Sequence, residues 1–110
     1  MAGQSIIFFG KYSTVANGSD YLSDPFDITP YEQLKVQIYL AGKTGSGTLT
    51  AQLQESSDLV TWSNKGSAVS PTAVGMSTID TSDCARYIRL AITSTFDGVT
   101  FWAMGVARES

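Results

Sequence analysis

The sequence predicts an all-β protein, a single antiparallel β-sandwich or barrel with about eight strands over residues 1–110. Three observations support this prediction. Apolar and polar residues alternate with a period of two in several segments, as in strands with one buried face. These segments recur roughly every 8 to 12 residues, with turn-forming residues between them. No window has the apolar spacing of a three-turn helix, and a chain of 110 residues is suited to one domain.

The first 30 residues contain the least regular part of the sequence. Residues 12–29 are rich in Ser, Asp, Asn and Gly, and Pro25 and Pro30 interrupt the stretch before the first clear alternation. We therefore expect the longest loop here. Residues 1–10 have a short apolar run with no basic residues ahead of it, which argues against a signal peptide.

Two alternating segments follow. Residues 34–40 place Leu, Val, Ile and Leu on one face, and residues 49–54 place Leu, Ala and Leu on one face. Both are predicted to be half-buried strands. Residues 42–47 contain three glycines and are expected to form a flexible hairpin connection between them.

The second half of the chain continues in the same way. A short segment opens at Trp62 and closes at Asn64-Lys65-Gly66, and residues 74–79 after Pro71 are expected to form an edge strand. Ile88, Leu90 and Ile92 form the inward set of the next strand. Asp97-Gly98 is predicted to be a hairpin turn into the last strand, residues 99–107.

The last strand is apolar on both faces. Phe101, Ala103 and Ala107 share one face, whereas Trp102, Met104 and Val106 share the other. Either this strand is central and loops cover its outer face, or another subunit covers it. In the second case, an exposed Trp-Met-Val stripe is a candidate interface.

The composition excludes several classes of function. The net charge is -3 and the seven basic residues are scattered, which argues against nucleic acid and anionic membranes as partners. The chain has no His, so it has no Ser-His or Cys-His pair and no His-Cys zinc site. Cys84 is the only cysteine, so no intrachain disulfide forms, as expected of folding in a reducing compartment. We expect no enzymatic activity and no cofactor.

Aspartates and tyrosines provide the remaining candidate sites. Asp20, Asp24 and Asp27 are a weak candidate for calcium or, as paired carboxylates, for acid–base chemistry, although Asp is also common in turns. Asp58 is expected to cap a turn, and Trp62 to fill the core beneath it. The aromatic side chains of Tyr12, Tyr21 and Tyr31 are expected in or near loops, where they could stack on sugars.

Two families resemble this sequence. Leu53-Gln54-Glu55-Ser56-Ser57-Asp58, then Trp62 and Arg86-Tyr87-Ile88-Arg89-Leu90, resemble the scaffold of galactose-binding-like (discoidin-like) jelly rolls, over residues 34–92. This likeness implies a β-sandwich with a jelly-roll arrangement of its strands, but no sugar-binding residue matches by position. The length, the Ser/Thr-rich surface and the lack of catalytic groups resemble small β-sandwich proteins of bacteriophage virions, such as head decoration proteins. That likeness implies assembly on a capsid lattice, often as trimers.

The predicted function is therefore that of a non-enzymatic virion protein. We expect a capsid decoration or head-accessory subunit, made in the host cytoplasm without a signal peptide and located in the virion. The expected partners are further copies of the chain, with a trimer favoured, and a capsid or other virion protein. The alternative is a carbohydrate-binding module for phage adhesion or glycan recognition that uses the loop aromatics. A third interpretation, a small hydrolase based on loop carboxylates, has no motif in its favour.

Overall fold

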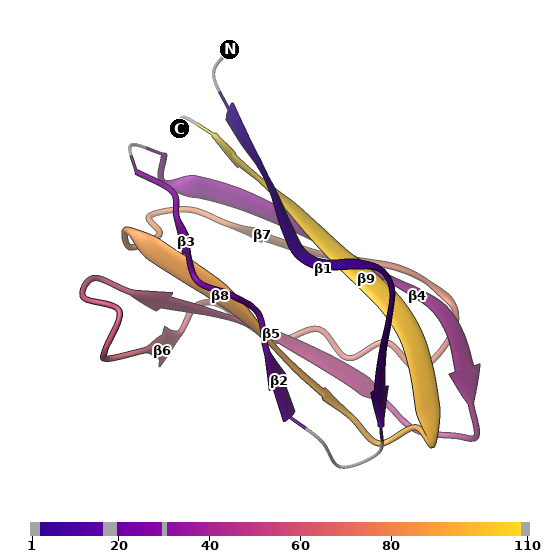
Figure 1. Cartoon of the computed structure of the whole chain (residues 1–110). Coiled ribbons are helices and arrows are strands. Elements are labelled where there is room, and N and C mark those ends of the chain that lie inside the picture. The colour runs from indigo at the N-terminus through magenta and orange to yellow at the C-terminus, as the bar shows by residue number, and fades with distance from the viewer. Residues whose placement is uncertain (1–2, 17–19, 30, 109–110) are drawn as a thin grey trace.

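The computed structural model describes residues 3–16, 20–29 and 31–108, of which residues 11–16 and residue 20 are described by their backbone alone. Over these ranges the chain forms nine strands in two antiparallel sheets that pack face to face (Figure 1). The described ranges contain no helix that is long and apolar enough to cross a membrane. The predicted all-β class is confirmed.

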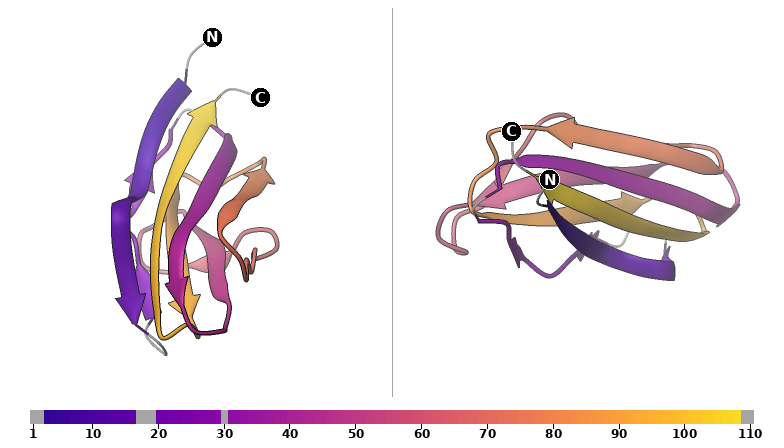
Figure 2. Two further views of the ribbon diagram at one scale, coloured as in Figure 1. Left: turned by 90° about the vertical axis from the view of Figure 1, so that its right-hand side faces the viewer. Right: turned by 90° about the horizontal axis from the view of Figure 1, so that it is seen from above.

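The first sheet has four strands in the order β1-β9-β4-β7 (Figure 2). Their bounds are β1 (Gly3–Ala16), β9 (Gly98–Arg108), β4 (Gln33–Thr44) and β7 (Gly75–Thr81). The second sheet has five strands in the order β2-β8-β5-β6, and β3 also pairs with β8. Their bounds are β2 (Asp20–Leu22), β3 (Phe26–Asp27), β8 (Tyr87–Ser94), β5 (Leu49–Ser56) and β6 (Ser63–Asn64).

The connectivity is that of a jelly roll. Both β2 and β3 pair with β8, so they act as one interrupted strand, and the sandwich has eight strand positions. Along the chain the strands alternate between the two sheets, except that β5 and β6 are neighbours in the same sheet. Two four-position sheets linked in this way are the jelly-roll arrangement. The predicted architecture and the approximate strand count are confirmed.

The core lies between the sheets and is built by the predicted alternation. Every second residue of the long strands is buried, and the side chains on the opposite face are more exposed. The innermost set, all without exposed surface, includes Val36, Ile38, Leu40, Leu49, Leu53, Ile88, Leu90, Ile92 and Phe101. Because a strand side chain points to one face or the other, this set fixes which residues of the same strands point outward.

The N-terminal strand β1 differs from the sequence-based prediction. Residues 12–29 do not form one loop, since they include the end of β1 and both short strands, β2 and β3. The pairing of β1 with β9 shifts register between Ile7 and Phe9, which is a β-bulge. As a result, the consecutive side chains of Phe8 and Phe9 both pack against the core. The bulge removes the period of two by which strands are identified in sequence.

Two predicted hairpins are crossings between sheets. The strands before and after residues 45–48 lie in different sheets, as do the strands that flank Asp97. The two crossings are hydrogen-bonded to each other: the backbone N–H of Thr48 donates to Thr95 Oγ1 at 2.8 Å, and that of Asp97 donates to the carbonyl of Thr44 at 3.1 Å. They form one corner of the sandwich. Alternation alone predicts a strand but not the sheet to which its neighbour belongs.

Glycines make this corner possible. Gly45 has a φ of 81°, in the left-handed region that glycine adopts without strain. At Gly47, a Cβ would lie 2.8 Å from the backbone nitrogen of Phe96. The two crossings can therefore approach each other only because residue 47 has no side chain.

Candidate interaction surface

The outer face of the four-stranded sheet carries the stripe predicted from the last strand. In the register of the sheet, Met104 lies between Ile7 on β1 and Gln37 on β4. In the next row Trp102 lies beside Tyr39, which in turn lies beside Met76 on β7. The apolar side chains therefore come from all four strands and form a surface that is wider than one strand. We call Ile7, Tyr39, Met76, Trp102, Met104 and Val106 the apolar face.

Much of the apolar face is open to solvent. The exposed fraction is 61% for Ile7, 57% for Met76, 45% for Val106 and 38% for Met104. Strand β9 is central in its sheet, as one sequence-based alternative expected, but no described loop covers these side chains. Sequence reasoning identified Trp102, Met104 and Val106. The alternation of residues 34–40 would also have predicted that Tyr39 points outward. Ile7 could not be predicted in this way, because the bulge after it interrupts the alternation of β1.

The aromatic pair on this face is well ordered by its own packing. The rings of Tyr39 and Trp102 stack with centroids 4.4 Å apart and planes within 4° of parallel. Stacked rings hold each other's orientation, and this reduces the entropy lost when a partner packs onto them. The pair therefore presents a rigid apolar surface at the centre of the sheet.

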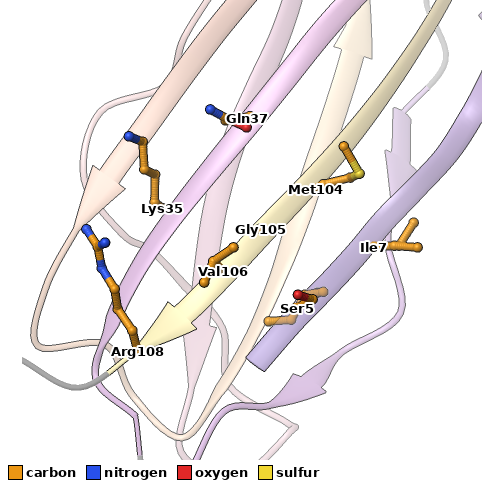
Figure 3. Close-up of a pocket in the computed structure, with 9 residues that line it drawn as sticks. Ser5, Ile7, Lys35, Gln37, Met104, Gly105, Val106 and Arg108 are labelled. Atoms are coloured by element: carbon orange, nitrogen blue, oxygen red, sulfur yellow. The ribbon is translucent and has the colours of Figure 1, made fainter. Parts of the chain in front are cut away.

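Beside this pair the face is hollowed. A shallow depression of about 430 Å³ lies over β9, with Met104 and Val106 on its floor and Ile7 at one side (Figure 3). Lys35 and Arg108 lie at another side of the depression, and Gln37 completes the rim. Lys35 lies beside Asp80 in the register of the sheet, and within the described ranges neither Lys35 nor Arg108 is in the ion pair between Arg86 and Asp27. The surface thus combines an apolar floor with a basic margin.

The opposite face of the sandwich is different. On the outer side of the five-stranded sheet, Arg89 donates to Gln54 Oε1 at 2.7 Å, and Gln54 Nε2 donates to Asn64 Oδ1 at 3.3 Å. Leu22, with 54% of its surface exposed, is an apolar exception at the edge. The two outer faces therefore have different chemistry, and the apolar one is the better interface.

Trp62 belongs to this polar face, and the prediction that it fills the core is wrong. The Arg89 guanidinium lies 4.2 Å from the centroid of the Trp62 ring, a cation–π contact. The indole is half-buried rather than enclosed. Sequence spacing alone could not reveal that the turn before Trp62 folds the ring onto the outside of the sheet.

That turn is the one expected from Asp58. The carboxylate accepts hydrogen bonds from the backbone N–H groups of Thr61 and Val60 at 2.8 and 2.9 Å, and from the hydroxyl of Ser56 at 2.9 Å. These bonds, that of Thr61 first, lower the pKa of Asp58 below its ordinary value. The predicted capping role is confirmed.

The tyrosines proposed for sugar stacking do not share one surface. Tyr21 pairs with Ile92 towards one end of β8. Tyr31 follows Asp27, which pairs with Tyr87 at the other end of β8. Tyr31 is partly buried and packs against the core. The side chain of Tyr12 lies outside the described residues. The structure does not bring Tyr21 and Tyr31 together as a platform for one ligand.

The proposed calcium ligands have other partners where they can be described. Asp27 forms an ion pair with Arg86 at 3.1 Å and accepts the backbone N–H of Thr29 at 2.9 Å. These two contacts, that of Thr29 first, lower the pKa of Asp27. Asp24 is exposed, and the side chain of Asp20 is outside the described residues. The part of the chain that is described contains no group of three or more acidic, Cys or His residues able to hold a metal ion.

Cys84 is half-buried and packs against the core. Burial raises the pKa of its thiol, so the reactive thiolate is disfavoured at neutral pH. This is the environment of a structural thiol.

No family model and no curated protein matches the sequence. Solved structures do match. The PBSX exported protein XepA aligns with a TM-score of 0.75 at 15% identity, over 97% of this chain and 37% of XepA. A chain of the T13 IBDV viral particle aligns with a TM-score of 0.65 at 10% identity, over 98% of this chain and 31% of that chain. The SPBc2 prophage-derived protein YomS aligns with a TM-score of 0.57 at 11% identity, over 96% of this chain and 92% of YomS.

At these identities the likeness concerns the fold. The chain spans about a third of the length of XepA and of the viral particle chain, and most of the length of YomS. The resemblance to phage β-sandwich proteins is confirmed at the level of the fold.

Proposed function

We propose that this chain is a non-enzymatic structural subunit of a phage virion, a capsid decoration or head-accessory protein that acts through protein–protein assembly. The observation that carries the proposal is the exposed apolar face of the four-stranded sheet. Contiguous apolar patches of this kind are uncommon on monomeric proteins and mark interaction sites.

The partner of the apolar face is another protein of the same virion. Burial of a large apolar side chain stabilises an interface by about 1.5–3 kcal/mol, and a stable interface buries roughly 1,200 Å² or more in total. A sheet face with an aromatic pair at its centre and a shallow depression beside that pair fits a protein surface with an apolar projection. Acidic side chains near that projection would meet Lys35 and Arg108.

The comparisons support the virion role because two of the matching structures are a viral particle and a prophage-derived protein. A non-enzymatic role is supported by the absence of His from the sequence. A closed homo-oligomer is part of the proposal, and the trimer favoured from the resemblance to phage decoration proteins is one form that it can take.

The test replaces apolar surface without altering the core. Ile7→Thr combined with Val106→Thr keeps β-branched residues at two exposed strand positions and removes two methyl contacts from the face. Val60→Thr is the matched control, since Val60 is 81% exposed and lies in the turn after β5. Trp102→Ala removes the aromatic anchor, which should cost about 2 kcal/mol or more of binding.

The measurement is the ratio of this chain to the major capsid protein in particles from the strain that encodes it, together with the melting temperature of each purified variant. We expect the double variant to melt like the parent but to be depleted from particles, and the control to be incorporated normally. Absence of the parent from particles would refute the virion role. Normal incorporation of both the double variant and Trp102→Ala would refute the apolar face as the interface.

A further inference from the structure

Within the described ranges the two sheets end in four edges, and three of them are poorly suited to pairing with another strand. At one end of the four-stranded sheet, β1 shifts register twice against β9. At the ends of the five-stranded sheet, β6 has two residues, and β2 and β3 have three and two residues with a gap between them. Short strands and bulges are the common means by which proteins prevent strand addition at an edge.

The fourth edge, β7, has none of these protections. It pairs with β4 through seven consecutive residues without a register shift, from Gly75 opposite Leu40 to Thr81 opposite Leu34. It contains no Pro and no Lys, and Asp80 is its one charged residue. Within the described ranges β7 pairs with β4 on one side, and no second strand pairs with β7 on its other side. Figure 2 shows β7 at the outer edge of its sheet, alongside β4.

We propose that β7 is a self-association edge, at which β7 of a second copy of this chain pairs with it antiparallel about a twofold axis. The pairing joins two four-stranded sheets into one continuous sheet of eight strands. It rests on the proposed assembly role but uses the backbone at the edge of the sheet rather than the apolar face, and Met76 is the residue that the two surfaces share. The edge supplies backbone hydrogen bonds, which are the main source of affinity in strand addition.

An antiparallel pairing of β7 with its own copy can keep every residue of the strand in register, with a Thr–Thr pair at its centre. An axis at Thr78 places Thr78 opposite its own copy, Met76 opposite Asp80, Ser77 opposite Ile79, and Gly75 opposite Thr81, so that all seven residues are paired. Shifting the centre to Asp80 would put two carboxylates directly opposite each other, which is unfavourable. The register centred on Thr78 therefore gives the longest overlap and also keeps the like charges apart.

This register also continues both faces of the sheet. Met76, Thr78 and Asp80 lie on the outer face of β7, in rows with Tyr39, Gln37 and Lys35 on β4. Because Met76 and Asp80 have the same parity along the strand, the outer side chains of one copy meet outer side chains of the other. The two apolar faces then point to the same side of the dimer, and both can contact one partner surface.

Cysteine cross-linking in a Cys84→Ser background tests the register directly. In the proposed pairing the two Thr78 Cα atoms are about 4.5–5.5 Å apart, within disulfide range, whereas the two Met76 Cα atoms are about 14 Å apart. We expect Thr78→Cys to form a disulfide dimer on mild oxidation and Met76→Cys alone to remain uncross-linked. A mixture of the Met76→Cys and Asp80→Cys chains should cross-link as a heterodimer. Equal or absent cross-linking of Thr78→Cys and Met76→Cys would overturn the proposal.

Two lysine variants of the otherwise unmodified chain provide an independent test. Thr78→Lys and Met76→Lys add the same charge to the same exposed face of β7. In the proposed pairing, Thr78→Lys puts two cations opposite each other and should weaken the dimer more than about tenfold, whereas Met76→Lys faces Asp80 of the other copy and should tighten it severalfold. The readout is the dimer dissociation constant from light scattering over a concentration series.

Equal weakening by both lysines would refute the pairing at β7. That outcome would leave the virion role intact, because the role is tested at Ile7, Val106 and Trp102. Conversely, the variants at Ile7, Val106 and Trp102 could lose incorporation while Thr78→Cys still cross-links normally. That result would show that the apolar face binds the virion and that the β7 edge pairs independently of it.

Discussion

At the level of single residues, short polar contacts determine how the turns of this sandwich are held. Asp58 organises the turn after β5 through two backbone N–H groups and the Ser56 hydroxyl. Its folded-state pKa lies below the unfolded value, so the ionised carboxylate stabilises the fold at pH above the unfolded pKa of about 3.9. That contribution is lost as the pH falls through the folded-state pKa.

Asp58→Asn should therefore have a pH-dependent effect. Near neutral pH we expect the variant to be less stable than the parent, because an amide oxygen is a weaker acceptor than a carboxylate. Below the folded-state pKa of Asp58 the difference should largely disappear. Urea denaturation across this pH range measures it, with the exposed Asp24→Asn as control. A difference that stays constant with pH would show that the charge of Asp58 is not involved.

Trp62 shows the limit of reasoning from residue type. A Trp after a capped turn is typical of a core residue, but here the ring lies over the Arg89 guanidinium on the outer face. The preference of a large aromatic residue for burial is satisfied by half-burial against a cation and a sheet. Burial of such a residue depends on where the chain directs it, and that is a tertiary property.

At the level of elements, the corner formed by residues 44–48 and 94–97 links the two sheets. Hydrogen bonds between Thr48 and Thr95, and between Asp97 and Thr44, hold the crossings together. Gly47 allows them to approach, since a Cβ there would lie 2.8 Å from both Thr95 C and Phe96 N, which are backbone atoms. Backbone atoms cannot rotate away as a flexible side chain can.

Gly47→Ala should accordingly destabilise the fold by about 1–3 kcal/mol, as overpacking does. Gly42→Ala is the matched control, because a Cβ at Gly42 has no atom within 4 Å and the position lies in the same part of the chain. It should change stability by less than about 1 kcal/mol. The midpoints of urea denaturation distinguish the two variants. Equal midpoints would mean that the corner adjusts to the extra methyl group without cost.

At the level of the whole molecule, the outer faces of the two sheets differ in chemical character. One sheet exposes an apolar face and a regular edge, and the other exposes polar side chains that are hydrogen-bonded to one another. Such asymmetry orients a subunit on a larger assembly, because only one side gains free energy from contact with a protein surface.

We expect calcium to make no contribution to the stability of the fold. A site with calcium at 100 times its dissociation constant would stabilise the fold by about 2.7 kcal/mol and raise the melting temperature by roughly 10 °C or more. Because Asp27 is paired with Arg86, we expect calcium and EDTA to leave both the melting temperature and the solution mass unchanged. A melting temperature or mass that falls with EDTA would indicate a metal site at Asp20, Asp24 and Asp27.

Local alternation of apolar and polar residues was enough to predict the fold class and most of the core. Alternation in residues 34–40, 49–54 and 88–92 predicts strands because side chains in a strand point to opposite faces, and the same alternation predicts the buried sets. Alternation also placed Trp102, Met104 and Val106 on one face of the last strand as a candidate interface, but both faces of that strand are apolar and the sequence did not show which of them is buried.

The order of the strands in each sheet, by contrast, became known from the three-dimensional structure. Three features depend on contacts between residues far apart in sequence. They are the two crossings at the glycine-rich corner, the bulge that turns Phe8 and Phe9 to the core, and the position of Trp62. The apolar face became a surface, rather than a stripe, when β1, β4 and β7 brought Ile7, Tyr39 and Met76 beside β9. Period and composition are local properties, whereas sheet order follows from the free energy of packing the whole chain.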